Sequence, residues 1–66
     1  MNRTKQELVF EITILANQLR RIAGKLDSLE EVEWSEHAEE MRGAGMIADG
    51  WVEGLKSELS QNPQQS

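Results

Sequence analysis

Apolar residues recur along the first half of the chain in alternating steps of four and three. The series runs Leu8, Ile12, Leu15, Leu19, Ile22, Leu26, Leu29. This heptad pattern is typical of a helix that packs one face against other helices. Val9, Ala16 and Ala23 each follow a member of the series and widen the apolar face, as bundle helices require. The pattern predicts a helix over about residues 4 to 29.

A second heptad series follows in a new phase, since the first phase would place Glu33 and Glu36 among core positions. The new series runs Trp34, Ala38, Met41, Gly45, Ala48, Val52, Leu55, Leu59. It predicts a second helix over about residues 32 to 59, with a turn where the phase changes. Ser28, in the sequence SLEE, has the capping-box pattern, and Ser35 is a second candidate for the N-cap.

Four glycines lie inside the second predicted helix, and each costs about 1 kcal/mol relative to alanine. They are Gly43, Gly45, Gly50 and Gly54. A break near the sequence RGAGM is therefore an alternative, although the continuous heptad register favours one helix. Residues 60 to 66, SQNPQQS, contain no apolar side chain and the only proline. We expect a disordered tail there, after a single helical domain over residues 1 to 59.

An antiparallel hairpin aligns the two series layer by layer. The expected pairs are Leu8 with Leu55, Ile12 with Val52, Leu15 with Ala48, Leu19 with Gly45, Ile22 with Met41, Leu26 with Ala38, and Leu29 with Trp34. Two helices cannot enclose a core, and a chain of 66 residues without cysteine has no disulfide to stabilise it. The sequence therefore predicts an all-α fold in which two hairpins form a homodimeric four-helix bundle. The arrangement of the hairpins is left open.

Charge is divided unevenly between the predicted helices. Residues 1 to 26 hold five basic and two acidic side chains, whereas residues 27 to 66 hold two basic and ten acidic ones. Six acids crowd the turn and the start of the second helix, namely Glu30, Glu31, Glu33, Glu36, Glu39 and Glu40. They are expected to form a solvated face, with acids at the helix N-terminus where the helix dipole favours negative charge, or a surface that repels or imitates nucleic acid.

Catalysis has little support in the sequence. His37 is the only histidine and lies between Glu33 and Glu40 at helical spacing, which is typical of a solvated or capped side chain. No paired nucleophile and base, phosphate-binding loop or metal-ligand cluster is present. We expect no enzymatic activity, cofactor, metal or small-molecule substrate. The N-terminus lacks a signal-peptide pattern and no segment is apolar enough to span a membrane, so we expect a soluble, cytoplasmic protein.

One further series of residues follows the outer side of the first helix. It comprises Phe10, Ile14, Gln18, Arg21 and Lys25, again in steps of four or three. RNA recognition uses such a mixture, with cations for phosphates, amides for sugar and base edges, and flat or apolar groups against bases. Phe10 and Ile14 are equally consistent with a broader dimer interface.

The chain resembles the Rop (repressor of primer) family of plasmid copy-number proteins over residues 1 to about 55. The two heptad series and the turn have the family's spacing without a gap. Identical residues include Gln18, Lys25, Leu26, Leu29, Glu33 and Glu39. The resemblance implies an antiparallel four-helix bundle of two hairpins, which binds paired RNA hairpins in loop-to-loop contact and so modulates plasmid copy number.

The family's RNA-binding face lies on the first helix, and the resemblance carries it to this chain. Arg3 stands where the family has a lysine, and Gln18 and Lys25 are retained. Ile14 replaces a phenylalanine and Phe10 replaces an asparagine. With Arg21, these are the candidate RNA-binding residues. The competing hypothesis is a helical protein-interaction module, such as an inhibitor or an antitoxin-like partner, whose acidic second helix docks on a basic surface.

Overall fold

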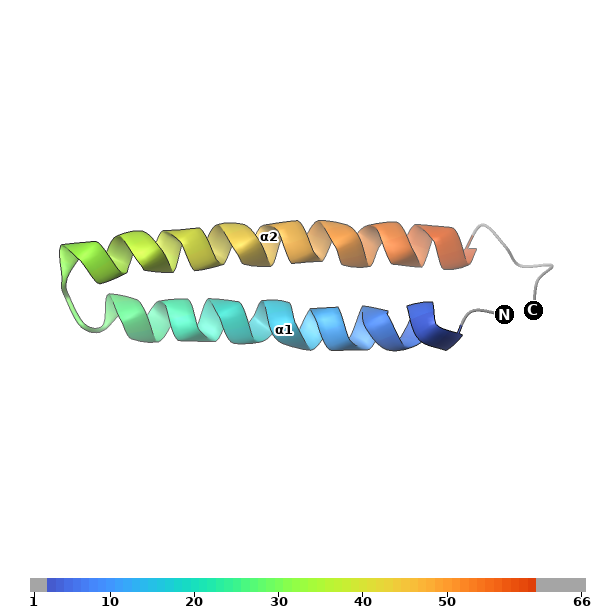
Figure 1. Cartoon of the computed structure of the whole chain (residues 1–66), viewed down its shortest axis with the longest axis horizontal. Coiled ribbons are helices and arrows are strands. Elements are labelled where there is room, and N and C mark those ends of the chain that lie inside the picture. Colours follow the sequence, from blue (N-terminus) through green and yellow to red (C-terminus); the bar gives the residue numbers. More distant parts are fainter. Residues whose placement is uncertain (1–2, 61–66) are drawn as a thin grey trace.

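The computed structural model describes residues 3 to 60 and consists there of two antiparallel α-helices (Figure 1). Helix α1 spans Arg3–Asp27 and helix α2 spans Val32–Ser60. The predicted all-α hairpin is confirmed, with helix ends within two residues of the expected ones. Ser60, assigned to the tail, ends α2, and the remaining tail residues lie outside the described range. Neither described helix is long and apolar enough to cross a membrane.

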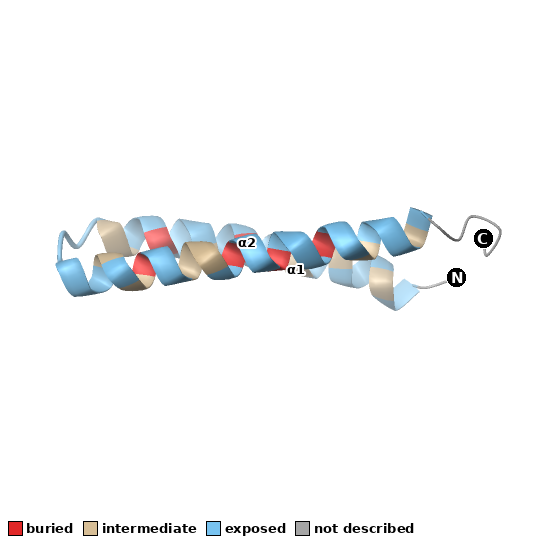
Figure 2. Ribbon diagram, turned by 90° about the horizontal axis from the view of Figure 1, so that it is seen from above, coloured by how far each residue is buried: buried red, intermediate tan, exposed pale blue. Residues whose placement is uncertain are grey.

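Small side chains form the contact between the two helices. The buried residues are Ala16, Ala23, Ala38, Gly45, Ala48 and Val52, and they follow the line along which α1 and α2 meet (Figure 2). No side chain larger than valine is buried within the described hairpin. Small residues allow the two backbones to approach closely, but their burial contributes little hydrophobic free energy.

The heptad register places Leu8, Leu15 and Ile22 between the helices, and this prediction is wrong for the hairpin. Their exposed fractions are 38%, 48% and 41%. On α1 the contact line runs through Ala16 and Ala23, each one residue later in the sequence. The close approach of two helices brings alanines to the contact line, so the larger neighbours flank it.

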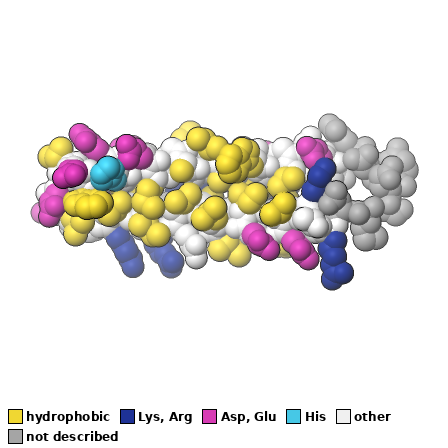
Figure 3. All heavy atoms as spheres, in the orientation of Figure 1, with side chains coloured by type: hydrophobic (Ala, Val, Ile, Leu, Met, Phe, Trp, Pro, Cys, Tyr) yellow, Lys and Arg dark blue, Asp and Glu magenta, His cyan; other side chains and the backbone are white. Residues whose placement is uncertain are grey.

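These flanking residues form one apolar face of the hairpin. Leu15 and Ile22 each precede a buried residue of α1, and Ala44 and Trp51 each precede a buried residue of α2. Because the helices are antiparallel, residues that precede the contact positions lie on the same side of both. We define the apolar face as Leu8, Leu15, Ile22, His37, Ala44 and Trp51. Figure 3 shows a band of hydrophobic side chains along one side of the hairpin, over both helices.

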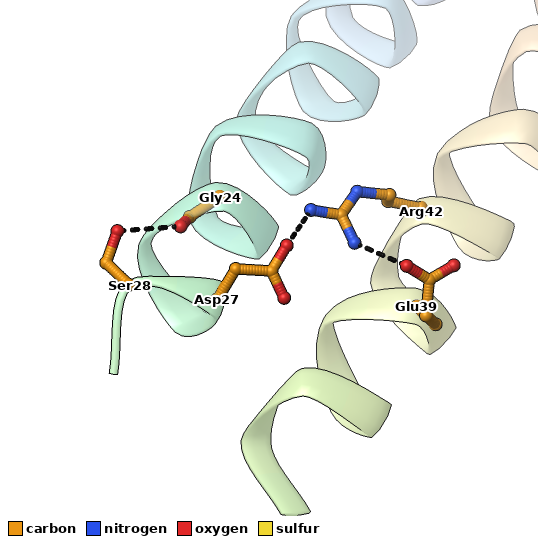
Figure 4. Close-up of polar contacts among 5 residues, drawn as sticks. All are labelled: Gly24, Asp27, Ser28, Glu39 and Arg42. Atoms are coloured by element: carbon orange, nitrogen blue, oxygen red, sulfur yellow. Dashed lines mark hydrogen bonds and ion pairs between the residues drawn. The ribbon is translucent and has the colours of Figure 1, made fainter. Parts of the chain in front are cut away.

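Three ion pairs connect α1 to α2. The Lys5 ammonium lies 2.5 Å from a Glu58 carboxylate oxygen, close to the open end of the hairpin. The Arg20 guanidinium lies 3.0 Å from Asp49 near the middle. Close to the turn, the Arg42 guanidinium bridges Asp27 of α1 and Glu39 of α2 (Figure 4). Because these side chains are partly exposed, each pair is expected to contribute at most about 1 kcal/mol to the register of the two helices.

The turn differs in detail from the prediction. Helix α2 begins at Val32, so neither Ser28 nor Ser35 caps it. Instead, the Ser28 hydroxyl donates a hydrogen bond of 3.1 Å to the Gly24 carbonyl and terminates α1 (Figure 4). Glu30 reverses the chain in the left-handed region with φ of 56°. A non-glycine residue tolerates this conformation at a cost of roughly 1–2 kcal/mol.

Helix α2 continues without a break through its glycines, so the alternative of two shorter helices is wrong. Gly45 is buried against α1, and a β-carbon there would lie 3.6 Å from the Ala16 carbonyl oxygen. Gly43, Gly50 and Gly54 have open space where a β-carbon would be. Inter-helix contacts and the ladder of backbone hydrogen bonds therefore offset the low helix propensity of glycine.

Candidate nucleic-acid interface

All six candidate RNA-binding residues lie on α1 and are exposed. We define the outer stripe as Arg3, Phe10, Ile14, Gln18, Arg21 and Lys25. The α1 residues that approach α2 are Val9, Ile12, Ala16, Leu19, Ala23 and Leu26, which are buried or half-buried. At 100° per residue the outer stripe lies on the opposite side of the helix. The hairpin therefore brings these six side chains together on one surface.

Two large apolar side chains on this surface are unusually exposed. Phe10 is 73% and Ile14 is 56% accessible. Neither side chain belongs to the apolar face, because both lie on the far side of α1 from α2. The hairpin alone thus gives no packing reason for an aromatic ring and a branched aliphatic group at these positions.

The ion pairs separate the basic residues into two groups. Of the seven Lys and Arg residues, five have a carboxylate partner: Arg3 with Glu7, Lys5 with Glu58, Arg20 with Asp49, Arg42 with Asp27, and Lys56 with Glu53. The side chains of Arg21 and Lys25 form no hydrogen bond or ion pair with any residue between 3 and 60. They lie four residues apart, so their charged groups are neighbours on the outer stripe.

Two features of this surface were not predicted from the sequence. Arg20 points toward α2, where it bonds both Asp49 and Asn17, so it adds no free charge to the outer stripe. Glu7 lies on the outer side and approaches Arg3 at 3.7 Å. The free positive charge is therefore concentrated at the C-terminal half of α1. The spacing of four residues between Arg3 and Glu7 predicts their ion pair from the sequence. The pair between Arg20 and Asp49 joins two helices, so it depends on the fold.

His37 lies on the apolar face close to the turn. Its Nδ1 is 2.9 Å from Glu40 Oε1, and its ring is 5.2 Å from the Trp34 ring at an angle of 59°. The hydrogen bond to Glu40 raises the pKa of His37 above its ordinary value of 6.5, and the charges of Glu33 and Glu36 add to the effect. The sequence predicted a solvated or capped His37, and in the structure its ring is hydrogen-bonded to the Glu40 carboxylate.

The acidic residues surround a shallow hollow beside the turn. It has a volume of about 410 Å³ and is lined by Asp27, Glu30, Glu31, Val32, Ser35, Glu36 and Glu39. Val32 is 79% exposed there. Within residues 3 to 60 no group of three acidic, histidine or cysteine side chains is arranged to hold a metal ion. The hollow is therefore an open surface lined mainly by acidic residues, and Val32 is the one apolar residue in its lining.

Comparisons of the chain with known proteins gave no match to a family model, to a curated protein or to a solved structure.

Proposed function

We propose that this protein is a non-enzymatic, homodimeric RNA-binding protein of the Rop type, which stabilises a loop-to-loop complex of structured RNAs and so modulates plasmid replication. One observation carries the proposal. Arg21 and Lys25 are the only cations of the described hairpin without a carboxylate partner, and they share the outer stripe with exposed Phe10 and Ile14.

Free cations and exposed apolar groups suit RNA for different reasons. Arg21 and Lys25 neutralise phosphates without first breaking an ion pair inside the hairpin, and the release of counterions drives that association. The Phe10 ring offers a flat surface on which an unpaired base stacks, at about 1–3 kcal/mol per base. Gln18 lies between these two groups and offers both a donor and an acceptor.

The net charge of the whole chain, −5, opposes binding to RNA in general. The acidic residues of α2 and the turn therefore restrict contact to the outer stripe of α1. The division of charge orients the protein, because the acidic end of the hairpin is repelled from the phosphates. This favours recognition of a particular RNA shape over coating of any RNA strand.

The test is a titration of the full-length protein with two complementary RNA hairpins, at low and at moderate salt. Lys25→Ala or Arg21→Ala should weaken binding and reduce the slope of log affinity against log salt, by about 0.9 for each lost duplex phosphate contact. Phe10→Ala or Ile14→Ala should weaken binding with little change in slope. Lys56→Ala is the matched control, since it removes one positive charge from α2.

Two results would reject the proposal. One is the absence of binding by the wild-type protein at low salt. The other is a loss of affinity in Lys56→Ala as large as in Lys25→Ala, which would show general attraction to a polyanion. Helical content measured on each variant by circular dichroism separates a loss of contact from a loss of fold.

A second candidate function is supported by the acidic hollow beside the turn. Glu30, Glu31 and Glu36 line it, and Val32 is exposed at its edge. A basic helix or loop of another protein with one apolar side chain would fit this surface. Reversal of the charges of Glu31 and Glu36 would abolish such binding and leave the affinity for RNA unchanged or higher, so the two functions are distinguishable.

A further inference from the structure

The side of α2 that faces away from α1 carries apolar residues that the hairpin does not use. Met46 is 73% and Ile47 is 58% exposed there. Gly43, Gly50 and Gly54 lie on the same side, and a β-carbon at any of them would meet nothing within 4 Å. Packing inside the hairpin therefore explains neither the large side chains nor the recesses between them. We define the outer face of α2 as Gly43, Met46, Ile47, Gly50 and Gly54, which at 100° per residue lie opposite the buried contact line.

The outer face of α2 continues into the acidic hollow beside the turn. Val32, Glu36 and Glu39 line the hollow, and they precede Gly43 along α2 in steps of four, three and four. Glu36 forms no ion pair with any residue between 3 and 60. This side of α2 is therefore acidic near the turn and apolar over about three further turns.

The outer stripe of α1 has its chemistry in the complementary order. Phe10 and Ile14 are exposed apolar residues toward the open end of the hairpin. Arg21 and Lys25 are cations without a carboxylate partner toward the turn. An outer stripe that lies antiparallel on the outer face of α2 in another copy would thus set apolar groups against apolar groups and cations against carboxylates.

One register satisfies these contacts together. The expected levels, to within one residue, are Phe10 with Gly50, Ile14 with Ile47, Gln18 with Gly43, Arg21 with Glu40, and Lys25 with Glu36. The recess at Gly50 receives the Phe10 ring, and the missing side chain at Gly43 leaves room for the Gln18 amide. The large groups of α1 therefore meet the small groups of α2.

Charge disfavours the other occupants of this surface. The cations of α2, Arg42 and Lys56, are both paired with carboxylates of the same copy, so two outer faces of α2 offer each other no free positive charge. An anionic membrane would be repelled by the hollow. Within residues 3 to 60, only α1 holds cations without a carboxylate partner.

We infer that the outer stripe of one copy docks on the outer face of α2 of a second copy, with both turns at the same end. The contact joins two different surfaces, so it can repeat from copy to copy, and it leaves the apolar face of the hairpin uncovered. A docked outer stripe cannot hold RNA at the same time. Assembly at high protein concentration therefore withdraws the RNA-binding surface, a consequence that rests on the proposed function.

Charge reversal tests the contact in the full-length protein without RNA. Lys25→Glu and Glu36→Lys each replace an attraction by a repulsion, so at low salt each should raise the dissociation constant of this assembly about tenfold. The double variant restores the pair with its signs exchanged and should assemble nearly as well as the wild-type protein. Sedimentation velocity over a series of protein concentrations measures all three variants.

Lys56→Glu is the matched control, because it changes the net charge by the same amount as Lys25→Glu. Lys56 lies 3.9 Å from Glu53 of the same helix and outside the outer face of α2. Its reversal should change the dissociation constant by no more than about twofold.

Single cysteines test the register, because the chain has no cysteine of its own. A mixture of Gln18→Cys and Gly43→Cys brings two thiols to one level across the contact and should give a disulfide-linked dimer on mild oxidation. Gln18→Cys mixed with Gly54→Cys is the control, since Gly54 lies about 16 Å further along the same face, and this mixture should give no such link. Mass spectrometry of the linked peptides identifies the joined residues.

Three results would overturn the inference. They are equal effects of Lys25→Glu and Lys56→Glu, no recovery of assembly in the double variant, and no link between Gln18→Cys and Gly43→Cys. Failure to bind RNA affects none of these measurements, so it would reject only the proposed function.

Discussion

At the residue scale, the ion pairs of this hairpin contribute little to stability. Their main effect is to neutralise particular side chains and to leave others charged. Exposed pairs such as Arg20 with Asp49 contribute only about 0–1 kcal/mol each. Their consequence is that five of the seven Lys and Arg side chains are already paired with a carboxylate of the hairpin. Arg21 and Lys25 keep their charge available for an outside partner.

His37 gives a pH-dependent contribution at this scale. Its pKa is raised in the folded state chiefly by the hydrogen bond to Glu40. A raised folded-state pKa means that the folded form binds the proton more tightly than the unfolded form. The stabilisation is therefore complete below about pH 6.5 and decreases as the pH rises through the folded-state pKa.

We predict that Glu40→Gln lowers the pKa of His37 toward 6.5 and reduces this pH dependence of stability. An NMR titration of the His37 ring protons measures the pKa directly. Glu53→Gln removes a carboxylate far from the ring and should leave the titration unchanged. If the pKa of His37 in Glu40→Gln equals the wild-type value, the hydrogen bond is not the cause of the shift.

At the element scale, the fully buried residues between the two helices are all small, and larger residues beside them, such as Ile12 and Leu19, are only half-buried. Alanine and glycine occupy the contact line of α2 at Ala38, Gly45 and Ala48. The two helices are therefore held mainly by their close approach along this line, and the exposed ion pairs between them add little. The larger apolar groups that flank it remain exposed, as Leu15 and Ile22 show.

Gly45 provides the prediction for this contact. A β-carbon there would meet the Arg20 side chain at 3.4 Å and the Ala16 carbonyl oxygen at 3.6 Å, which are ordinary contacts. Gly45→Ala should therefore stabilise the helix by up to about 1 kcal/mol. Gly45→Leu has no such space and should cost roughly 1–3 kcal/mol. Urea unfolding monitored by circular dichroism measures both changes.

Gly54→Ala is the control for the contribution of helix propensity alone, because nothing lies within 4 Å of its β-carbon position. It should stabilise α2 by about 1 kcal/mol. If Gly45→Leu were as stable as Gly54→Ala, the close approach of α1 and α2 at this level would be wrong.

At the scale of the whole molecule, the described hairpin is one layer of helices without an enclosed core. Its buried apolar side chains are four alanines and one valine, whereas the apolar face leaves Leu15 and Trp51 at 48% and 61% exposure. Exposed apolar surface of this extent marks an interaction site in a soluble domain. In the proposed homodimer, burial of this surface would supply much of the free energy of folding.

Leu15→Ala and Phe10→Ala distinguish the two exposed surfaces. Leu15 belongs to the apolar face, so in the proposed homodimer its truncation should cost about 2–5 kcal/mol, as for a buried leucine, and should raise the dissociation constant. Phe10 belongs to the outer stripe, so its truncation should change stability by no more than about 0.5 kcal/mol. Urea unfolding at several protein concentrations measures both. A loss of about 3–5 kcal/mol in Phe10→Ala would place Phe10 in the dimer interface instead.

The sequence by itself determined the two helices, their approximate ends and their antiparallel pairing. Heptad spacing is a local property of a helix, and the change of phase near Leu29 required a turn whatever the partner. It also identified the outer stripe, since the position of Phe10 and Lys25 around α1 follows from helical geometry alone.

The tertiary structure alone decided which residues lie between the helices and which cations are free. Heptad spacing is equally satisfied by Leu15 or by Ala16, and the choice depends on how closely the backbones approach. Arg20 and Arg21 are adjacent in sequence, yet one faces Asp49 across the hairpin and the other faces outward. Such pairing joins residues far apart in the chain, so no local pattern contains it.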